Sequence, residues 1–189
     1  MNLLNREPEP MTVEKNTEKR ITLVIHDLKA DEFGKLYTGS REDLVVISDE
    51  KPISPCMGCF SCWTKTPGLC VIPDAFQNIG SLFSKAKEIV LISRCVYGGF
   101  SPFVKNALDR TVPSLLPFFK IDTDKMMHHQ HRSKNRPVLS LNFYGETGSG
   151  EKETAEKLGR ANALNFNAVS YSVYFYGSAK EAVKAGICA

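Results

Sequence analysis

The sequence lacks most of the features that mark membrane, secreted or nucleic-acid-binding proteins. No run of about 18 apolar residues occurs, so we predict no membrane-spanning helix and no membrane partner. Residues 1–20 are polar and have neither an apolar core nor a small-residue cleavage site, so they differ from a secretory signal and are expected to form a flexible leader. The net charge is only +3, without a basic stripe interleaved with aromatic residues, which argues against a nucleic-acid partner.

Internal repeats and low-complexity tracts are also absent, and the composition is that of an ordinary globular protein. Hydrophobic residues make up 42% of the 189 residues, and charged residues make up 24%. A chain of this length is typical of one domain with a sizeable core. We therefore expect residues 21–189 to fold as a single domain of a cytoplasmic protein.

Five short runs rich in β-branched and other apolar residues predict five strands. The first four runs are almost continuously apolar, which is typical of strands covered on both faces of a sheet. The fifth alternates aromatic and small polar residues, which favours a place at the edge of the sheet. The five runs are Ile21–Ile25, Leu44–Ile47, Ile89–Ile92, Val138–Leu141 and Val169–Tyr176.

Helical patterns separate these strands, and we expect a short first helix between the first two. The other predicted helices are residues 76–86 with Asp74 as N-cap, a helix opened by Ser101-Pro102, Glu151–Asn165 and Ala179–Lys184. Alternating strands and helices imply a parallel sheet with right-handed crossovers. We predict an α/β protein with a doubly wound five-stranded parallel sheet, strand order 2-1-3-4-5, and helices on both faces. Its ligand site should lie at the carboxyl ends of the strands.

The segment Lys120–Arg136 interrupts this alternation. It is rich in Lys, Arg and His and has little apolar periodicity, so we interpret it as an insertion or hairpin between a helix and a strand. Its histidines His128, His129 and His131 are candidate metal ligands, but a solvated loop is the favoured interpretation.

The strongest local signal is a cluster of cysteines. Cys56, Cys59 and Cys62 follow one another at C-x-x-C spacing, and Cys70 comes after seven further residues. Such a run is typical of cubane iron–sulfur clusters, in which the thiolates of one short loop supply most of the ligands. Structural zinc more often uses two C-x-x-C pairs separated by a longer spacer. The alternatives are therefore a [4Fe–4S] cluster, a zinc ion, or free and redox-active thiols.

A second signal follows the third predicted strand. Gly98 and Gly99 would let the backbone approach a flat ligand closely, and the Tyr97 ring could stack beside that ligand. The helix opened by Pro102 would direct its N-terminal N–H groups into the same crevice. The alternative is an ordinary strand-to-helix turn in which the two glycines only supply the bend. We favour the ligand interpretation because the loop lies at the predicted switch point of the sheet.

With these two motifs, the chain resembles the flavodoxin-like NAD(P)H-dependent FMN reductase family, and its cysteine spacing resembles the iron–sulfur flavoprotein branch. The similarity covers roughly residues 21–176 and includes a Y-x-G…K-x-x-x-D-R pattern, met here by Tyr97, Gly99, Lys105, Asp109 and Arg110. The resemblance implies a flavodoxin-like fold, bound FMN, and a homodimer or homotetramer with the flavin near a subunit boundary.

The resemblance also implies roles for individual residues. Lys105, Asp109 and Arg110 would hold the helix and the neighbouring chain rather than perform chemistry. The metal ligands would be Cys56, Cys59, Cys62 and Cys70. The residues facing the isoalloxazine would be Cys95, Val96, Tyr97, Gly98, Gly99 and Phe100, together with Tyr144 and Gly145.

One segment departs from the family pattern. The family follows its first strand with a loop rich in Gly, Ser and Thr that wraps the FMN phosphate, whereas this chain reads His26 to Gly34 there. Asp27, Asp31 and Glu32 would repel a phosphate from a helix N-terminus, and nearby lysines offset this only partly. We therefore expect weakened or rearranged phosphate anchoring.

These observations favour an FMN-dependent oxidoreductase that passes electrons from NAD(P)H to a small-molecule or iron–sulfur acceptor. The flavin carries such chemistry, so no catalytic acid or base is expected from the protein. The alternative is a flavodoxin-like binding protein, or a thiol- or metal-based redox sensor, that has lost normal FMN anchoring.

Overall fold

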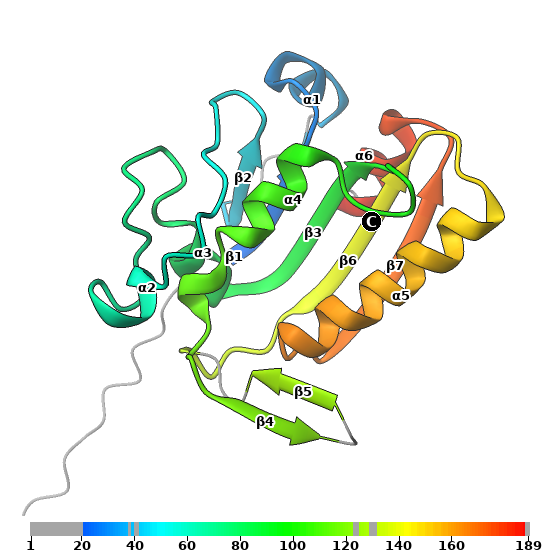
Figure 1. Cartoon of the computed structure of the whole chain (residues 1–189). Coiled ribbons are helices and arrows are strands. Elements are labelled where there is room, and N and C mark those ends of the chain that lie inside the picture. The colour runs from blue at the N-terminus through cyan, green and yellow to red at the C-terminus, as the bar shows by residue number, and fades with distance from the viewer. Residues whose placement is uncertain (1–20, 38, 40–41, 123–124, 129–131, 188–189) are drawn as a thin grey trace, which may run out of the picture.

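The computed structural model describes residues 21–37, 39, 42–122, 125–128 and 132–187 (Figure 1). The predicted leader, residues 1–20, and two of the candidate metal ligands, His129 and His131, lie outside the described residues. Among the described residues, no helix has the length and apolar composition needed to cross a bilayer.

Five parallel strands form one sheet in the order β2-β1-β3-β6-β7. The strands of the sheet alone, counted along the chain, therefore have the order 2-1-3-4-5, as predicted. β7 lies at one edge, as its alternating pattern indicated. The strands are β1 (Ile21–His26), β2 (Leu44–Ser48), β3 (Ala86–Arg94), β6 (Val138–Tyr144) and β7 (Ser170–Tyr176).

Helices cover both faces of the sheet (Figure 1). The helices α1 and α6 pack on one face, and α3, α4 and α5 pack on the other. The ranges are α1 (Ala30–Leu36), α2 (Ser61–Thr64), α3 (Ile79–Lys85), α4 (Pro102–Asp109), α5 (Ser149–Asn165) and α6 (Ala179–Ile187), with a 3-10 turn η1 at Val112–Ser114. The short first helix and the helix opened by Ser101-Pro102 are confirmed.

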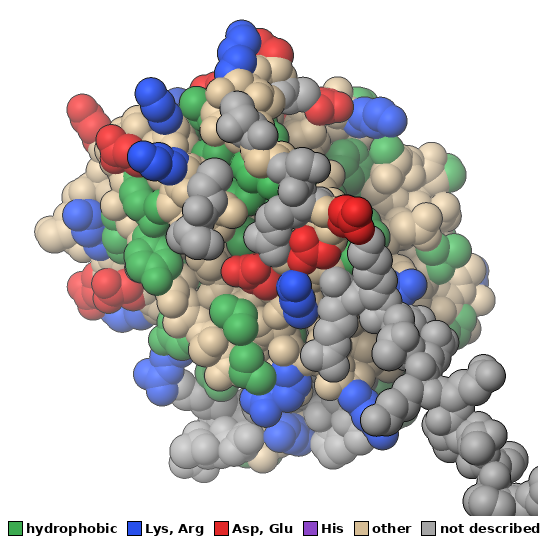
Figure 2. Space-filling model, turned by 180° about the vertical axis from the view of Figure 1, so that it is seen from behind, with side chains coloured by type: hydrophobic (Ala, Val, Ile, Leu, Met, Phe, Trp, Pro, Cys, Tyr) green, Lys and Arg blue, Asp and Glu red, His purple; other side chains and the backbone are tan. Residues whose placement is uncertain are grey.

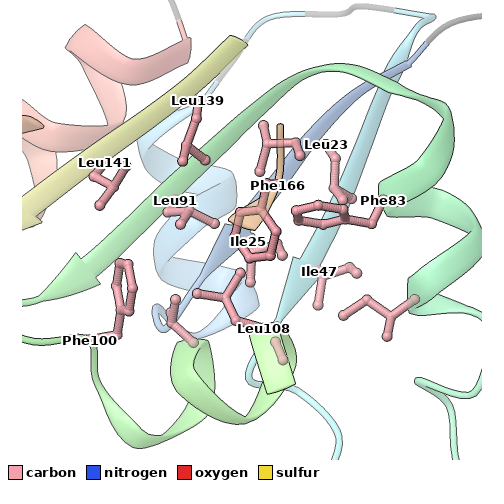
Figure 3. Packing of buried hydrophobic residues seen from close by; sticks show 14 of the residues in the cluster. Leu23, Ile25, Ile47, Phe83, Leu91, Phe100, Leu108, Leu139, Leu141 and Phe166 are labelled. Atoms are coloured by element: carbon pink, nitrogen blue, oxygen red, sulfur yellow. The ribbon is translucent and has the colours of Figure 1, made fainter. Parts of the chain in front are cut away.

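The near-continuous apolar character of the central strands follows from this double cover. In β1, Leu23 and Ile25 face the core under α3, α4 and α5, whereas Val24 faces the smaller core under α1 and α6. Figure 3 shows the larger core, in which Phe83 and Phe166 pack over the sheet residues. Because successive side chains of a strand point to opposite faces, most of them are apolar when both faces are covered.

One predicted helix boundary is wrong. The helix expected over 76–86 begins only at Ile79, with Asn78 as its N-cap, and Ala86 already belongs to β3. The Asp74 carboxylate accepts the N–H of Phe76, but its main partner is a distant arginine described below. The acidic residue before an apolar pattern is therefore explained by a tertiary ion pair rather than by helix capping.

The segment between α4 and β6 contains a hairpin, as one interpretation of its sequence proposed. β4 (Phe119–Asp122) and β5 (Lys125–His128) pair antiparallel and form a separate two-stranded sheet. On the face seen in Figure 2, acidic and basic side chains of the described residues lie among one another in the upper part of the view, and basic side chains occupy the lower part.

Candidate functional site

The loop that follows β3 at the carboxyl edge of the sheet is a tight turn. The N–H of Val96 donates to the carbonyl of Gly99 at 3.0 Å, and the N–H of Gly99 donates back at 2.8 Å. The two residues between them have positive φ angles, 52° for Tyr97 and 78° for Gly98. Two consecutive left-handed residues inside such a pair of hydrogen bonds define a type I′ turn.

Tyr97 is the unusual residue of this turn. It adopts the left-handed conformation that an aromatic residue rarely takes, and it is 88% exposed, so no packing of its ring explains the strain. Strained backbone of this kind is concentrated at ligand sites, where the surrounding structure holds it in place. The geometry therefore presents an aromatic ring at the edge where ligands bind to doubly wound sheets.

Gly98 and Phe100 have structural roles that the sequence did not reveal. A Cβ atom on Gly98 would lie 2.6 Å from Cβ of Thr154, so the glycine allows α5 to pack against the turn. The Phe100 ring is buried and stacks on Phe143 with ring centroids 5.3 Å apart. Gly99 has more space, since the nearest contact of an added Cβ would be the Val96 carbonyl at 3.4 Å.

The other predicted flavin-facing residues lie along the same edge. Cys95 donates its N–H to the carbonyl of Tyr144 at 3.0 Å, and Gly145 donates its N–H to the carbonyl of Tyr176 at 3.0 Å. Gly145 has a φ angle of 102°, which requires glycine. Hydrogen bonds thus connect the loops after β3, β6 and β7 into one continuous edge.

Asp27 connects three strands at this edge. Its carboxylate accepts the backbone N–H of Arg94 at 2.9 Å and the hydroxyl of Tyr144 at 3.0 Å. Burial raises the pKa of Tyr144, and the negative charge of Asp27 raises it further, so the hydroxyl stays protonated as a donor. The carboxylate therefore links the ends of β1, β3 and β6 at the position where the resembled family has its phosphate-binding loop, which agrees with the expected change in phosphate anchoring.

The charges around α1 are also unlike those of a phosphate site. Asp31 and Glu32 lie in the first turn of this seven-residue helix. The Nζ atoms of Lys29 and Lys35, the two lysines that offered partial compensation, lie 3.2 Å from the Asp49 carboxylate and 3.3 Å from the Asp31 carboxylate respectively. Both lysines thus already have an acidic partner.

The cysteine loop lies between β2 and α3. Gly58 and Phe60 have positive φ angles of 63° and 55°, and these allow the chain to curl before α2. All four clustered cysteines line one cavity of about 80 Å³, with the exposed Cys56 and Cys59 on the outer side and the half-buried Cys62 and Cys70 deeper.

The thiols of this loop differ in acidity. Burial raises the pKa of Cys62, and the neighbouring Cys70 and Cys56 raise it further. Hydrogen bonding by Ser61 lowers the pKa of Cys59. The thiols therefore influence one another electrostatically, as expected for sulfur atoms that surround a single small volume.

This donor set suits some metal centres better than others. In the described part of the chain, no three His, Cys, Asp or Glu side chains are close enough to hold a single metal ion, which argues against zinc as the sequence alternative. A cubane cluster differs because each of its irons takes one cysteine, so its four ligands surround a cube instead of converging on one ion. Four thiols around one cavity fit that requirement in donor type and in number.

Arg110 lies next to this cavity and organises the loop. Its guanidinium donates to both oxygens of the Asp74 carboxylate, at 2.7 and 2.9 Å, and to the carbonyl of Ser54 at 2.8 Å. Lys105 forms an ion pair with Asp109 one helical turn away, at 2.6 Å. The structural role that the resemblance implied for these three residues matches these contacts. Sequence reasoning missed the partner Asp74, 36 residues away from Arg110.

Comparisons with known proteins place this site in context by sequence and by fold. No family model matches the chain. An iron–sulfur flavoprotein of Methanocaldococcus jannaschii is 32% identical over 80 residues, which are 42% of this chain and 40% of the relative, so the match spans less than half the relative's length.

Solved structures extend the comparison to most of the chain. General stress protein 14 of Treponema denticola, in complex with FMN, superimposes with a TM-score of 0.54 at 9% identity, covering 89% of this chain and 96% of the other. An FMN-dependent NADH-azoreductase of Bacillus anthracis, also in complex with FMN, gives a TM-score of 0.50 at 12% identity, with coverage of 88% and 97%.

The chain therefore has the flavodoxin-like α/β fold, as its sequence predicted. The resemblance to iron–sulfur flavoproteins and FMN reductases is confirmed by these similarities in sequence and in fold. At identities of 9% and 12% the structural likeness concerns the fold, and the activity has to be argued from the site itself.

Proposed function

We propose that this protein is an FMN-dependent oxidoreductase that takes electrons from NAD(P)H. The observation that carries the proposal is the strained, exposed Tyr97 at the carboxyl edge of a flavodoxin-like sheet. The proteins that share the fold, among them an FMN-dependent NADH-azoreductase, support this cofactor and donor. The acceptor is a small molecule or an iron–sulfur cluster on the cysteine loop.

When bound, the flavin supplies the hydride and electron chemistry. The residues of this chain would bind and orient it. The loop Cys95–Phe100 would contact the flat ring system, with Tyr97 beside it, and the loop at Tyr144-Gly145 would border it. Asp27 would hold the loop ends after β3 and β6 at a fixed separation through its two hydrogen bonds.

The flavin proposal predicts a specific effect of replacing Tyr97 by asparagine. Asparagine tolerates the left-handed conformation, so Tyr97→Asn should leave the free energy of unfolding unchanged or slightly higher. Loss of the ring should weaken flavin binding by about threefold to tenfold, because aromatic stacking contributes about 0.5–1.5 kcal/mol. Fluorescence titration of FMN with each apo-protein measures the affinity, and Tyr171→Ser on the edge strand controls for loss of an exposed tyrosine.

The same titration, repeated with riboflavin, measures how much the phosphate of FMN contributes to binding. Because Asp27 occupies the crevice and the nearby lysines are paired with carboxylates, FMN should bind no more than a few times more tightly than riboflavin. A large preference for FMN would show that phosphate anchoring is intact elsewhere. No saturable change in fluorescence at high micromolar protein would refute the flavin proposal.

We further propose that Cys56, Cys59, Cys62 and Cys70 hold a [4Fe–4S] cluster. Support comes from the shared cavity, the all-thiol donor set and the partial similarity to an iron–sulfur flavoprotein. Anaerobically prepared wild type should contain about four irons and four sulfides per chain. Cys56→Ser should lose most of this iron and destabilise the loop, because metal binding and loop ordering share their free energy. Absence of iron and sulfide from the anaerobic wild type would contradict the cluster.

A second candidate function is a binding or redox-sensing protein without flavin. The Asp27 network favours it, since a hydrogen-bonded carboxylate stands where the resembled family has its phosphate loop. The titration and the iron assay together separate the two functions. Iron without flavin binding would indicate a metal-based sensor, and neither would indicate a thiol sensor or a binding protein.

We also propose that the protein forms a homo-oligomer and works in the cytoplasm. A groove of about 420 Å³ separates α4 from α5 and is lined largely by apolar side chains, including Leu108, Val112, Leu115 and Phe166. Such a groove suits the homodimer or homotetramer that the family resemblance implies, with a second copy covering it. A cytoplasmic location would keep the free thiols of the cysteine loop reduced.

A further inference from the structure

A single side chain holds both ends of the cysteine loop. Arg110, directly after α4, donates to the carbonyl of Ser54 before the first cysteine and to the carboxylate of Asp74 after the last one. The N–H of Ser54 also donates to the Asp74 carboxylate at 3.2 Å, which completes a closed ring of hydrogen bonds. The span 54–74, which contains all four clustered cysteines, is therefore closed at its base by one guanidinium.

This guanidinium also borders the cysteine cavity, and one of its donors is unused within the described part of the chain. Arg110 is only 1% exposed and lines the cavity together with the four cysteines. Its Nε atom is buried and makes no hydrogen bond among the described residues. A permanent positive charge with an unused donor thus lies beside thiols that become anionic when they bind a metal.

We propose that Arg110 is a positioning residue for the iron–sulfur cluster: it fixes the loop through Ser54 and Asp74 and offsets the negative charge of the cluster. The inference rests on the proposed cluster. A cubane with four thiolate ligands is an anion, and hydrogen bonds and nearby charges help to set its reduction potential. The cation therefore stabilises the reduced cluster, which carries one more negative charge.

Two variants separate charge compensation from simple loop closure. Arg110→Met removes the cation, and Asp74→Asn removes the anion that partly neutralises it. Both variants break the hydrogen-bonded ring and should lower thermal stability and speed the loss of iron to a chelator by about tenfold or more. The reduction potential should shift in opposite directions, more negative in Arg110→Met and more positive in Asp74→Asn.

The measurements are iron and sulfide per chain, the rate of iron loss to a chelator, and the midpoint potential from an anaerobic optical titration of reconstituted protein. Lys157→Met is the matched control, because it also removes a cation that is paired with a carboxylate, but its side chain is 75% exposed and lies on α5, outside the lining of the cysteine cavity. Its potential should equal that of the wild type. Arg110→Lys keeps the positive charge but loses the bidentate contact with Asp74, and it replaces Arg110→Met if that variant does not fold. The reduction potential of Arg110→Lys should stay near that of the wild type, while its iron is lost faster to the chelator.

The outcomes distinguish this inference from the proposed function. A wild type that takes up no iron overturns both. A wild type with a stable cluster, combined with potentials that are equal or shifted in the same direction in Arg110→Met and Asp74→Asn, overturns the positioning role alone. When Arg110→Lys stands in for Arg110→Met, a potential in Arg110→Lys that moves as far as in Asp74→Asn also overturns it.

Discussion

Replacing Gly98 by alanine is expected to lower the free energy of unfolding by about 3 kcal/mol. The backbone φ angle of 78° costs a residue with a Cβ atom about 1–2 kcal/mol, because that atom crowds the following carbonyl. The new methyl group would also lie 2.7 Å from the Glu151 carbonyl and 2.6 Å from Thr154, so α5 would have to move. Accommodating an extra methyl group in a packed site lowers the free energy of unfolding by about a further 1–3 kcal/mol.

Urea unfolding of wild type, Gly98→Ala and Gly99→Ala tests this expectation. Gly99 is the matched control, because an added Cβ there meets only the Val96 carbonyl at 3.4 Å. Gly99→Ala should lose less than about 1 kcal/mol. Equal losses in the two variants would show that contact between the turn and α5 is not what requires glycine at position 98.

The sheet was predictable because burial on two faces leaves a strong local signal. β1, β3 and β6 must be apolar at almost every position when helices cover both faces, and their short runs stand out in the sequence. Alternation with right-handed crossovers restricts the sheet to doubly wound orders, and the order 2-1-3-4-5 among them is that of the flavodoxin-like family that the chain resembles. Edge strand β7 was recognised for the opposite reason, since its side chains are less completely covered.

The tertiary contacts of the acidic residues were not predictable. Asp74 has the sequence context of a helix N-cap, yet its carboxylate pairs with Arg110, and no local pattern marks a partner 36 residues away. Asp27 was recognised as unfavourable for a phosphate, but its hydrogen bond to the Tyr144 hydroxyl spans 117 residues. Local patterns determine elements, whereas ion pairs of this kind depend on how the finished layers come together.

The loop after β3 shows a third situation, in which residue types were noted correctly but their reasons were incomplete. Sequence reasoning treated Gly98 and Gly99 alike, either as a close approach to a ligand or as the bend of an ordinary turn. In the structure, Gly98 provides a left-handed turn position and space for α5, while Gly99 closes the turn through two backbone hydrogen bonds. Neighbouring glycines with the same local signal can therefore answer different physical requirements.

Lowering the pH is expected to destabilise the protein through His26, by about 2 kcal/mol between pH 7 and pH 5. The ring is fully buried and stacks on Phe33 with centroids 4.1 Å apart, and its Nε2 atom has no hydrogen-bond partner among the described residues. Burial lowers the pKa of His26 from 6.5 to about 4, although the Glu50 carboxylate favours the charged form. The folded protein therefore resists a proton that the unfolded chain accepts readily.

The direction of the effect follows from proton binding. Between about pH 6.5 and pH 4 the unfolded chain binds more protons at this residue than the folded chain, so the free energy of unfolding falls as the pH falls through that range. Above pH 6.5 the contribution of His26 to stability is fully present.

Urea unfolding at pH 7, 6 and 5 should show a steeper loss of unfolding free energy in wild type than in His26→Asn. Asparagine keeps an acceptor for the Leu28 N–H, which donates to Nδ1 of the ring, but it cannot titrate. The variant will be less stable at every pH because the ring stacking on Phe33 is gone, so the slopes are compared rather than the absolute values. Parallel slopes in the two proteins would show that His26 is not the group through which acid destabilises the fold.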